Sequence, residues 1–321
     1  MSVQPPDLDR VAGCILGAAI GDALGHPVEF IGSLEAIRKA YGPKGVTGYV
    51  LWWRDGPRRF APYTDDTQMA EVTLRALLAA REAGVGLEPT MERVGRGYAE
   101  WAEAPQGGHR APRNACLRGA HELRNGRPWR TGDPEAGGCG SVMRAYPFGV
   151  LFSHDESTAE RWAVEHSRLT HAHPMALAAC AGLALGVLRA LHGAEPFEVL
   201  DGVIEAAARW DEETAGLCRS AARGELSRQP PEKALDRLQG WNAREAIAAA
   251  VYVFGRHPDA AREALLEAVN SPGDSDSIAT LVGAWIGARL GLGALPPDWM
   301  RDVERSEELL ELARTVHSAS G

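Results

Sequence analysis

The sequence predicts an all-α fold, and three observations lead to this prediction. Apolar residues recur at three- and four-residue spacing along much of the 321-residue chain, as they do on one face of an amphipathic helix. Alternating β-branched runs are nearly absent, and only residues 46–53 form a short strand candidate. No linker or low-complexity tract divides the chain, whose length allows one large domain or two. We therefore expect a single domain over residues 1–321.

Helical periodicity is clearest in a few segments. In two of them the apolar residues begin directly after an aspartate motif, and they run from Met69 to Ala80 and from Ile278 to Ile286. Further helices are expected over residues 174–191, 199–209, 243–254, 260–269 and 306–316.

Glycines at every fourth position mark two of the expected helices. Each glycine inside a helix costs roughly 1 kcal/mol relative to alanine, so a repeated row needs a compensating reason. A spacing of four places the glycines on one face, where a second helix can approach closely. The rows are Gly13, Gly17, Gly21 and Gly25, then Gly283, Gly287 and Gly291, with a shorter echo at Gly182 and Gly186. We interpret them as central, tightly packed helices; a membrane-type glycine zipper is disfavoured because no uncharged stretch approaches the ~18–20 residues of a span.

Composition excludes several classes of function. The net charge is −9 with acidic and basic residues interleaved, which argues against a general nucleic-acid or anionic-membrane surface but leaves room for a local basic pocket. The five cysteines are odd in number and scattered, without a Cys-x-x-Cys pair, so a disulfide framework or zinc ribbon is not expected. Residues 1–10 lack the pattern of a signal peptide. We expect a cytoplasmic monomer that does not bind a membrane.

Two short aspartate motifs carry the strongest chemical signal. Thr64-Asp65-Asp66-Thr67 and Asp274-Ser275-Asp276-Ser277 each end a loop rich in Pro or Gly and each precede an apolar helix. Helix capping is the alternative explanation, because such residues satisfy free N–H groups at a helix start. Two adjacent aspartates flanked by hydroxyls repel one another, however, unless a hard cation such as Mg²⁺ or Mn²⁺ lies between them. If the fold brings both motifs together, they form a two-metal site typical of a hydrolase.

Three further elements are candidates for binding or catalysis. Glu29 lies between Val28 and Phe30, where partial burial raises the pKa of a carboxyl group toward use as an acid or base; a surface glutamate is the alternative. A glycine cluster lets backbone N–H groups approach a phosphate or sugar, and it spans Gly137, Gly138, Cys139, Gly140 and Ser141. His171 precedes an expected helix, as a ligand-facing residue or as a cap, and no zinc-ligand spacing accompanies it.

Together these residues resemble the ADP-ribosylglycohydrolase family, which includes dinitrogenase-reductase-activating glycohydrolases and the hydrolases of ADP-ribosyl-arginine and ADP-ribosyl-serine. The similarity extends from about Val11 to Leu292 and follows the family's order of motifs. The matching elements are residues 17–25 with Glu29, residues 64–69, residues 138–144, His171, and residues 270–278.

The resemblance implies a compact orthogonal helical bundle with two Mg²⁺ or Mn²⁺ ions in a central cleft. The implied metal ligands are Thr64, Asp65, Asp66, Asp274, Asp276 and Ser277, with Asp276 as the bridging ligand. Glu29 and Asp66 are the implied catalytic residues. The implied elements that bind ADP-ribose are Gly137, Gly138, Cys139, Gly140, Ser141 and His171.

Three positions depart from the family's pattern. Ser277 stands where many members have threonine, which keeps the hydroxyl oxygen. Cys139 stands where some members have asparagine, so amide contacts with the substrate are not expected there, and Pro272 replaces a common glycine. None of these changes removes an implied metal ligand.

The implied function is hydrolysis of the glycosidic bond between ADP-ribose and a protein side chain, arginine being favoured, or in a small ADP-ribose conjugate. Residues 30–62 are expected to act as a lid over the site. A metal-dependent nucleotide phosphohydrolase is an alternative, since clustered aspartates also serve phosphoryl transfer. The other alternative is a non-catalytic ADP-ribose-binding protein on the same fold.

Overall fold

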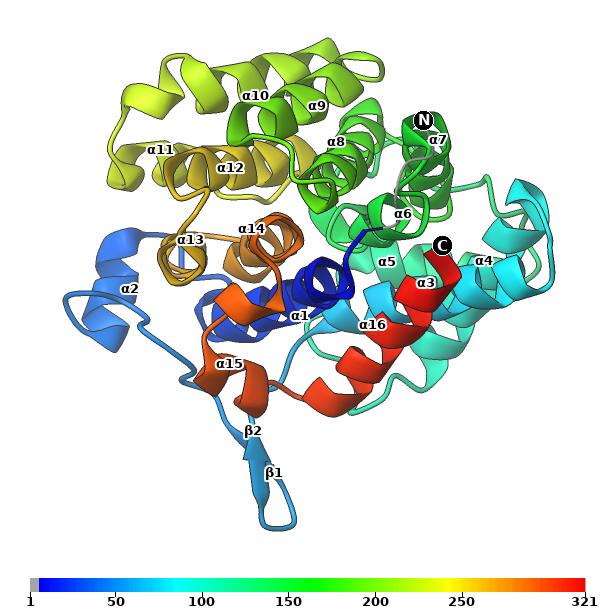
Figure 1. The fold of residues 1–321 in the computed structure, drawn as a ribbon, viewed down its shortest axis with the longest axis horizontal. Helices are drawn as coiled ribbons and strands as arrows, with labels where there is room; N and C mark the ends of the chain where they lie inside the picture. Colours follow the sequence, from blue (N-terminus) through cyan, green and yellow to red (C-terminus); the bar gives the residue numbers. More distant parts are fainter. Residues whose placement is uncertain (1–5, 321) are drawn as a thin grey trace.

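The computed structural model describes residues 6–320 and confirms that the chain is mostly helical (Figure 1). Within this range it contains sixteen α-helices, four short 3₁₀ helices and one two-stranded hairpin. The α-helices are α1 (Leu8–Gly25), α2 (Leu34–Tyr41), α3 (Asp65–Glu82), α4 (Leu87–Glu103), α5 (Asn114–Arg124), α6 (Tyr146–Leu151), α7 (Glu156–Ser167), α8 (Pro174–Leu191), α9 (Pro196–Ala208), α10 (Glu212–Arg223), α11 (Pro231–Arg237), α12 (Ala243–Arg256), α13 (Ala261–Val269), α14 (Ser275–Leu290), α15 (Pro297–Asp302) and α16 (Ser306–Ser320). The remaining elements are η1 (His26–Val28), η2 (Cys139–Ser141), η3 (Leu226–Arg228), η4 (Leu292–Ala294), β1 (Trp53–Asp55) and β2 (Arg58–Phe60).

Helices α1 and α14 form the centre of the core and share the most extensive contact between any two elements (Figure 1). Their glycine rows face one another, which confirms that each row permits the close approach of a second helix. A Cβ atom added to Gly17 would lie 2.4 Å from the carbonyl oxygen of Gly283, and one added to Gly287 would lie 1.9 Å from the carbonyl oxygen of Gly13. Only glycine therefore permits this approach of the two backbones.

Two described segments, Leu8–Val28 and α8, are long and apolar enough to cross a membrane by length and composition. This corrects the expectation that no uncharged stretch approaches the size of a span, because a few charges do not exclude a span by length and composition. Leu8–Val28 contains Asp9, Arg10 and Asp22, and α8 contains Arg189, without lowering the mean hydropathy far. In the fold, 89% and 83% of the two apolar windows are buried, since both helices pack into the core.

The helices expected from periodicity are all present, with ends that differ by a few residues. The strand expected over residues 46–53 is wrong, since the hairpin lies at Trp53–Asp55 and Arg58–Phe60. The earlier segment is held by side chains instead of by a neighbouring strand. Asn270 accepts a hydrogen bond from the Val46 amide at 2.8 Å and donates one to the Val46 carbonyl at 2.9 Å.

The close contact between α1 and α14 also positions the site. A Cβ atom added to Gly25, at the end of α1, would lie 2.4 Å from the Cα atom of Asp276 in the first turn of α14. The N-terminus of α3 reaches the same region, because α3 contacts both α1 and α14. The end of one helix and the beginnings of two others thus meet at the predicted site.

Candidate metal and active site

The two aspartate motifs form the N-termini of α3 and α14. Thr64 is the N-cap of α3, and its hydroxyl accepts a hydrogen bond from the Asp66 amide at 3.3 Å. Asp274 is the N-cap of α14, and Asp276 accepts a hydrogen bond from the Ser277 amide at 2.9 Å. Both motifs are buried. Helix N-termini carry partial positive charge, so they favour carboxylates at these positions.

Asp22 anchors the start of α3 from within α1. Its carboxylate accepts hydrogen bonds from the Thr64 amide at 2.9 Å, the Thr67 amide at 3.0 Å and the Thr67 hydroxyl at 2.6 Å. These bonds satisfy N–H groups that the first turn of a helix leaves free. Asp22 therefore fixes the position of Asp65 and Asp66 without being an expected ligand itself.

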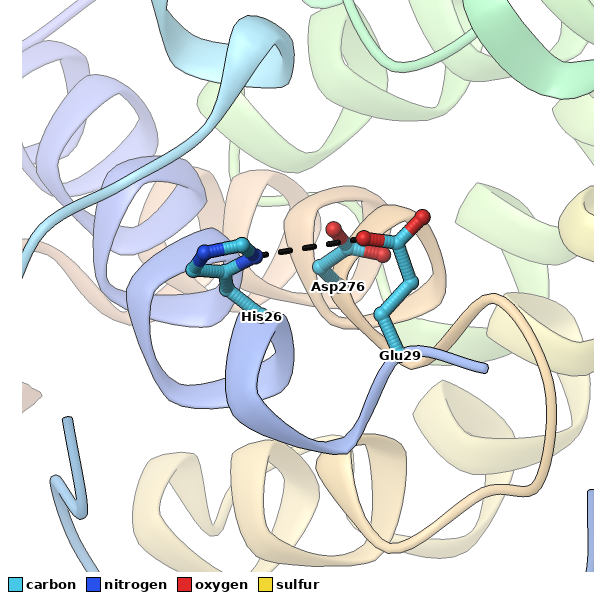
Figure 2. A group of neighbouring side chains, drawn as sticks. All are labelled: His26, Glu29 and Asp276. Carbon is cyan, nitrogen blue, oxygen red and sulfur yellow. Dashed lines mark ion pairs between the residues drawn. The ribbon is translucent and has the colours of Figure 1, made fainter. Parts of the chain in front are cut away.

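Glu29 follows η1 and lies beside Asp276 (Figure 2). Its side chain is buried, so the surface alternative is wrong. One oxygen, Oε1, lies 3.6 Å from an Nη2 atom of Arg113, and the other, Oε2, lies 3.9 Å from Nδ1 of His26. Ligand atoms of His26, Glu29 and Asp276 all lie within 4.8 Å of one another.

The carboxyl groups are close enough to influence one another's ionisation. Burial raises the pKa of Asp65, Asp66 and Asp276 well above the ordinary value, and neighbouring carboxylates raise it further. Burial likewise raises the pKa of Glu29. Like charges that share a buried site disfavour ionisation of each other. Asp66 interacts in this way with Asp274 as well, so the two motifs act on one another as a single cluster.

The acid cluster fits a hard divalent cation. The Oδ2 atom of Asp66 and the Oε2 atom of Glu29 are buried without a hydrogen-bond partner. Buried polar atoms are normally hydrogen-bonded, so a bound cation would supply the partner that these two oxygens lack. Carboxylate and hydroxyl oxygens are the donors that Mg²⁺ and Mn²⁺ prefer.

Arg113, which the sequence did not single out, supplies a positive charge at the edge of the cluster. Its Nη2 atom lies 2.7 Å from Oδ2 of Asp274. The guanidinium carbon lies 4.9 Å from the ring centre of Trp241 and 6.0 Å from that of Phe30, and these two rings stack at 5.7 Å. The cation–π contacts hold the guanidinium between the carboxylates and the aromatic pair.

The Cys139 thiol contacts the second aspartate motif. It donates to Oδ2 of Asp274 at 2.5 Å and lies 3.4 Å from the Ser277 hydroxyl. Burial raises the pKa of the thiol well above its ordinary value, and the charge of Asp274 adds to this effect. Cys139 therefore stays protonated, which disfavours a nucleophilic role.

His171 faces the glycine cluster. A Cβ atom added to Gly140 would lie 3.2 Å from its Cε1 atom, and one added to Gly138 would lie 3.8 Å from its Nε2 atom. Burial, with the charge of Arg144, lowers the pKa of His171 to about 3, so the ring is neutral. Arg144 donates to the Thr170 hydroxyl at 2.7 Å, and this hydroxyl lies 2.7 Å from Nδ1 of His171. The other ring nitrogen, Nε2, is buried without a hydrogen-bond partner and faces the glycines.

Other members of the glycine cluster have structural contacts. The Gly137 carbonyl accepts a hydrogen bond from the Ala243 amide at 2.9 Å, which ties the loop to α12. The Ser141 hydroxyl lies 2.8 Å from that of Ser167 inside the core. A cavity of about 610 Å³ between α3 and α4 is lined by none of the predicted site residues.

Sequence reasoning missed Asp22, His26 and Arg113. Asp22 stands within the glycine-rich motif of α1, and its position one turn before Gly25 could have indicated a role at the end of that helix. His26 follows the same motif directly. Arg113 carries no local signal, because its partners Glu29 and Asp274 are distant along the chain.

Comparison with known proteins identifies the family. The family model for ADP-ribosylglycohydrolase matches residues 4–321. The ADP-ribosylarginine hydrolase Tri1 of Pseudomonas putida is 29% identical, over 96% of this chain and 78% of the relative. The ADP-ribosyl-[dinitrogen reductase] glycohydrolase of Rhodospirillum rubrum is 28% identical, over 96% and 94%. A solved ADP-ribosylglycohydrolase-related protein complex aligns with a TM-score of 0.70 at 28% identity, covering 98% of this chain and 99% of that one. The chain belongs to the ADP-ribosylglycohydrolase family.

Proposed function

We propose that the chain is a metal-dependent hydrolase of the glycosidic bond between ADP-ribose and a protein side chain, with arginine as the favoured linkage. The observation that carries this proposal is the buried cluster formed by the carboxylates at two helix N-termini together with Glu29, in which one oxygen of Asp66 and one of Glu29 lack a hydrogen-bond partner. Family membership supports ADP-ribose as the substrate, and the named activity of the Pseudomonas putida relative supports arginine.

Two Mg²⁺ or Mn²⁺ ions are the proposed cofactors. The residues that would hold them are Thr64, Asp65, Asp66, Asp274, Asp276 and Ser277. When bound, such ions lower the pKa of water and orient hydroxyl groups of a sugar. Asp22 and the two helix N-termini keep the ligands in place before binding, so little rearrangement is needed.

Glu29 is the proposed proton-transfer residue. Burial raises the pKa of its carboxyl group, which favours the protonated form that a general acid requires. In the proposed reaction, Glu29 delivers a proton to the side-chain nitrogen as the bond from that nitrogen to the anomeric carbon breaks. Water adds to the anomeric carbon, and the proton that the water loses restores the Glu29 carboxyl group. The products are free ADP-ribose and the unmodified arginine side chain. Arg113 holds the other Glu29 oxygen and keeps the carboxyl group facing the cluster.

The glycine cluster and His171 form the proposed binding element for the rest of ADP-ribose. Gly138 lacks a side chain where the loop passes the imidazole, so a ligand can approach the backbone. In this proposal neutral His171 carries its proton on Nε2, which has no hydrogen-bond partner within the protein and would donate to a phosphate or ribose oxygen.

The proposal is tested by comparing wild-type protein with D276N in an assay for ADP-ribose released from an arginine-modified peptide. We expect release to need Mg²⁺ or Mn²⁺, to stop with chelator, and to fall at least about 100-fold in D276N while the helical circular dichroism is kept. D298N, which changes an exposed aspartate of α15, is the matched control and should behave as wild type. Full activity in D276N, or activity after exhaustive chelation, contradicts the metal-dependent mechanism.

The remaining expectations stand as proposals with their own tests. We propose one domain over residues 1–321, a monomer and a cytoplasmic location. Limited proteolysis, analytical ultracentrifugation and cell fractionation respectively test these three properties.

A further inference from the structure

We propose that His26 is a metal ligand, so that the site built from His26, Glu29 and Asp276 binds a divalent transition ion such as Mn²⁺ more tightly than Mg²⁺. The inference rests on the proposed metal dependence and deepens it. It concerns the metal-loaded protein without substrate, in which the Glu29 carboxyl group is ionised, so the proposed proton transfer requires Glu29 to leave the ion when substrate is bound. His26 lies outside the six ligand positions implied by the family motifs, and it follows Gly25 at the end of α1.

The three side chains come from different elements and point toward one another (Figure 2). His26 begins η1, Glu29 follows η1, and Asp276 lies in the first turn of α14. Their ligand atoms lie within 4.8 Å of one another. Octahedral coordination with bonds of ~2.1 Å places adjacent ligands roughly 3 Å apart and opposite ligands roughly 4.2 Å apart. Small side-chain rotations are therefore enough to bring the three atoms to bonding distance.

Two of the three groups present buried atoms that have no hydrogen-bond partner and only a long ion-pair contact with each other (Figure 2). Nδ1 of His26 and Oε2 of Glu29 are both buried and both lack a hydrogen bond. They lie 3.9 Å apart, which is too far for a direct hydrogen bond. Because buried polar atoms are normally paired, two of them aimed at the same space indicate a ligand between them.

The other oxygens of the carboxylates are held by the chain itself. Oε1 of Glu29 faces Arg113 at 3.6 Å, and Oδ1 of Asp276 accepts a hydrogen bond from the Ser277 amide at 2.9 Å. Contacts of this kind orient metal ligands in advance. They leave Oε2 of Glu29 directed toward His26.

The ligand set indicates the class of metal. Carboxylates suit both Mg²⁺ and Mn²⁺, whereas imidazole nitrogen is a good donor to transition ions and a poor one to Mg²⁺. One imidazole with two carboxylates therefore shifts preference toward transition ions. An all-oxygen site made from the six motif ligands alone has no such bias.

Pulsed electron paramagnetic resonance of the Mn²⁺-loaded full-length protein tests the inference. We expect ¹⁴N modulation from a bound imidazole in the wild type, and its loss in H26A. The control H121A changes an exposed histidine in the last turn of α5 and should keep the modulation. Absence of ¹⁴N modulation in the wild type, or its persistence in H26A, overturns the inference.

Calorimetric titrations supply a second readout that does not depend on the spectrum. H26A should weaken Mn²⁺ binding at least tenfold and Mg²⁺ binding less than threefold, while equal weakening of both overturns the proposal. Retained Mg²⁺ binding also shows that the variant folds.

ADP-ribose release by the wild type is measured in parallel. A wild type that shows ¹⁴N modulation but releases no ADP-ribose with any metal supports the His26 site and contradicts the proposed function.

Discussion

Individual side chains in the acid cluster are oriented by neighbours that never need to touch the substrate. Asp22 fixes the backbone of Thr64 and Thr67, and Arg113 holds one oxygen of Glu29. Arg144 orients His171 through the Thr170 hydroxyl. At this scale, the chemistry of the site depends on buried groups whose ionisation the fold has already shifted.

Glu29→Gln tests the proton-transfer role. The amide keeps the size of the side chain but cannot donate an acidic proton, so kcat should fall by about 10²–10⁴ at saturating metal. Steady-state kinetics on an arginine-modified peptide measure this loss. E92Q, at an exposed position of α4, is the control and should leave kcat unchanged. A kcat for E29Q within threefold of the wild type excludes the role.

His171 should make folding depend on pH in a defined direction. Its pKa is about 3 in the folded protein and ~6.5 when unfolded, so the unfolded chain binds more protons between these values. Its contribution to stability is complete above pH 6.5 and is lost as pH falls toward 3. Urea unfolding at pH 7 and pH 4.5 should show a smaller loss in H171Q than in the wild type, by on the order of 2 kcal/mol. An equal loss in both proteins contradicts a neutral buried imidazole.

Among the elements, α1 and α14 determine the architecture through glycine. Their backbones touch along the full glycine rows, and the same contact brings Asp276 against Gly25. The same contact between these two helices therefore determines both the core packing and the position of Asp276 in the site. The hairpin of β1 and β2 projects from the helical body and contributes little to this core (Figure 1).

Gly17→Ala should destabilise the protein. The added methyl group would lie 2.4 Å from the backbone oxygen of Gly283, which cannot rotate away. We expect a loss of at least about 2 kcal/mol in the free energy of unfolding, measured by urea denaturation. G216A is the matched control, because its added methyl group meets only Nη2 of Arg219, at 3.9 Å. The control should be neutral or more stable by up to about 1 kcal/mol, and an equally stable G17A contradicts the account of the helix pair.

The stability of the whole molecule depends on the ionisation of the acid cluster. Burial raises the folded-state pKa of Asp65, Asp66 and Asp276 above the unfolded value. Without metal, ionisation of these buried carboxyl groups at neutral pH lowers the free energy of unfolding. This destabilisation is relieved as pH falls through the folded pKa values, because the groups become protonated. A divalent ion removes the same penalty by supplying positive charge, and it competes with protons for the carboxylates.

Mn²⁺ should therefore raise the melting temperature more at pH 7.5 than at pH 5.5. A free concentration of 100 Kd corresponds to about 2.7 kcal/mol of stabilisation. D66N removes one buried charge, so without metal the variant should melt at or above the wild-type temperature. Addition of Mn²⁺ should raise its melting temperature by less than it raises that of the wild type. Differential scanning calorimetry measures both effects. A metal-induced shift that is the same at both pH values, or the same in D66N, contradicts a buried carboxylate site.

Part of this structure follows from local patterns in the sequence. The glycine rows predicted that each of these helices packs closely against another helix, because spacing by four specifies a face and the missing side chains allow a close approach. The structure identifies α1 and α14 as partners. The aspartate motifs predicted two helix starts, since capping chemistry is local. The ends of α8 were predicted to the residue by Pro174 and the apolar run after it.

The rest depends on contacts between distant residues. Residues 46–53 have the composition of a strand, but the side chain of Asn270 takes the backbone bonds that a neighbouring strand would provide. Arg113 reaches the cluster only because α5 begins beside it in three dimensions. No local sequence pattern predicts this contact between distant residues. The partnerless atoms of His26 and Glu29 likewise become visible only when the side chains are placed.

Product identification by mass spectrometry separates the proposed reaction from the alternatives. The wild-type protein is incubated with an arginine-ADP-ribosylated peptide and Mn²⁺, with D276N and a chelated sample alongside. We expect free ADP-ribose and the unmodified peptide in the wild-type reaction alone. Release of AMP with a phosphoribosyl group left on the peptide would show a phosphohydrolase. Tight binding of ADP-ribose without turnover of arginine- or serine-linked substrate would show a binding protein, and either result would contradict glycosidic hydrolysis by the acid cluster.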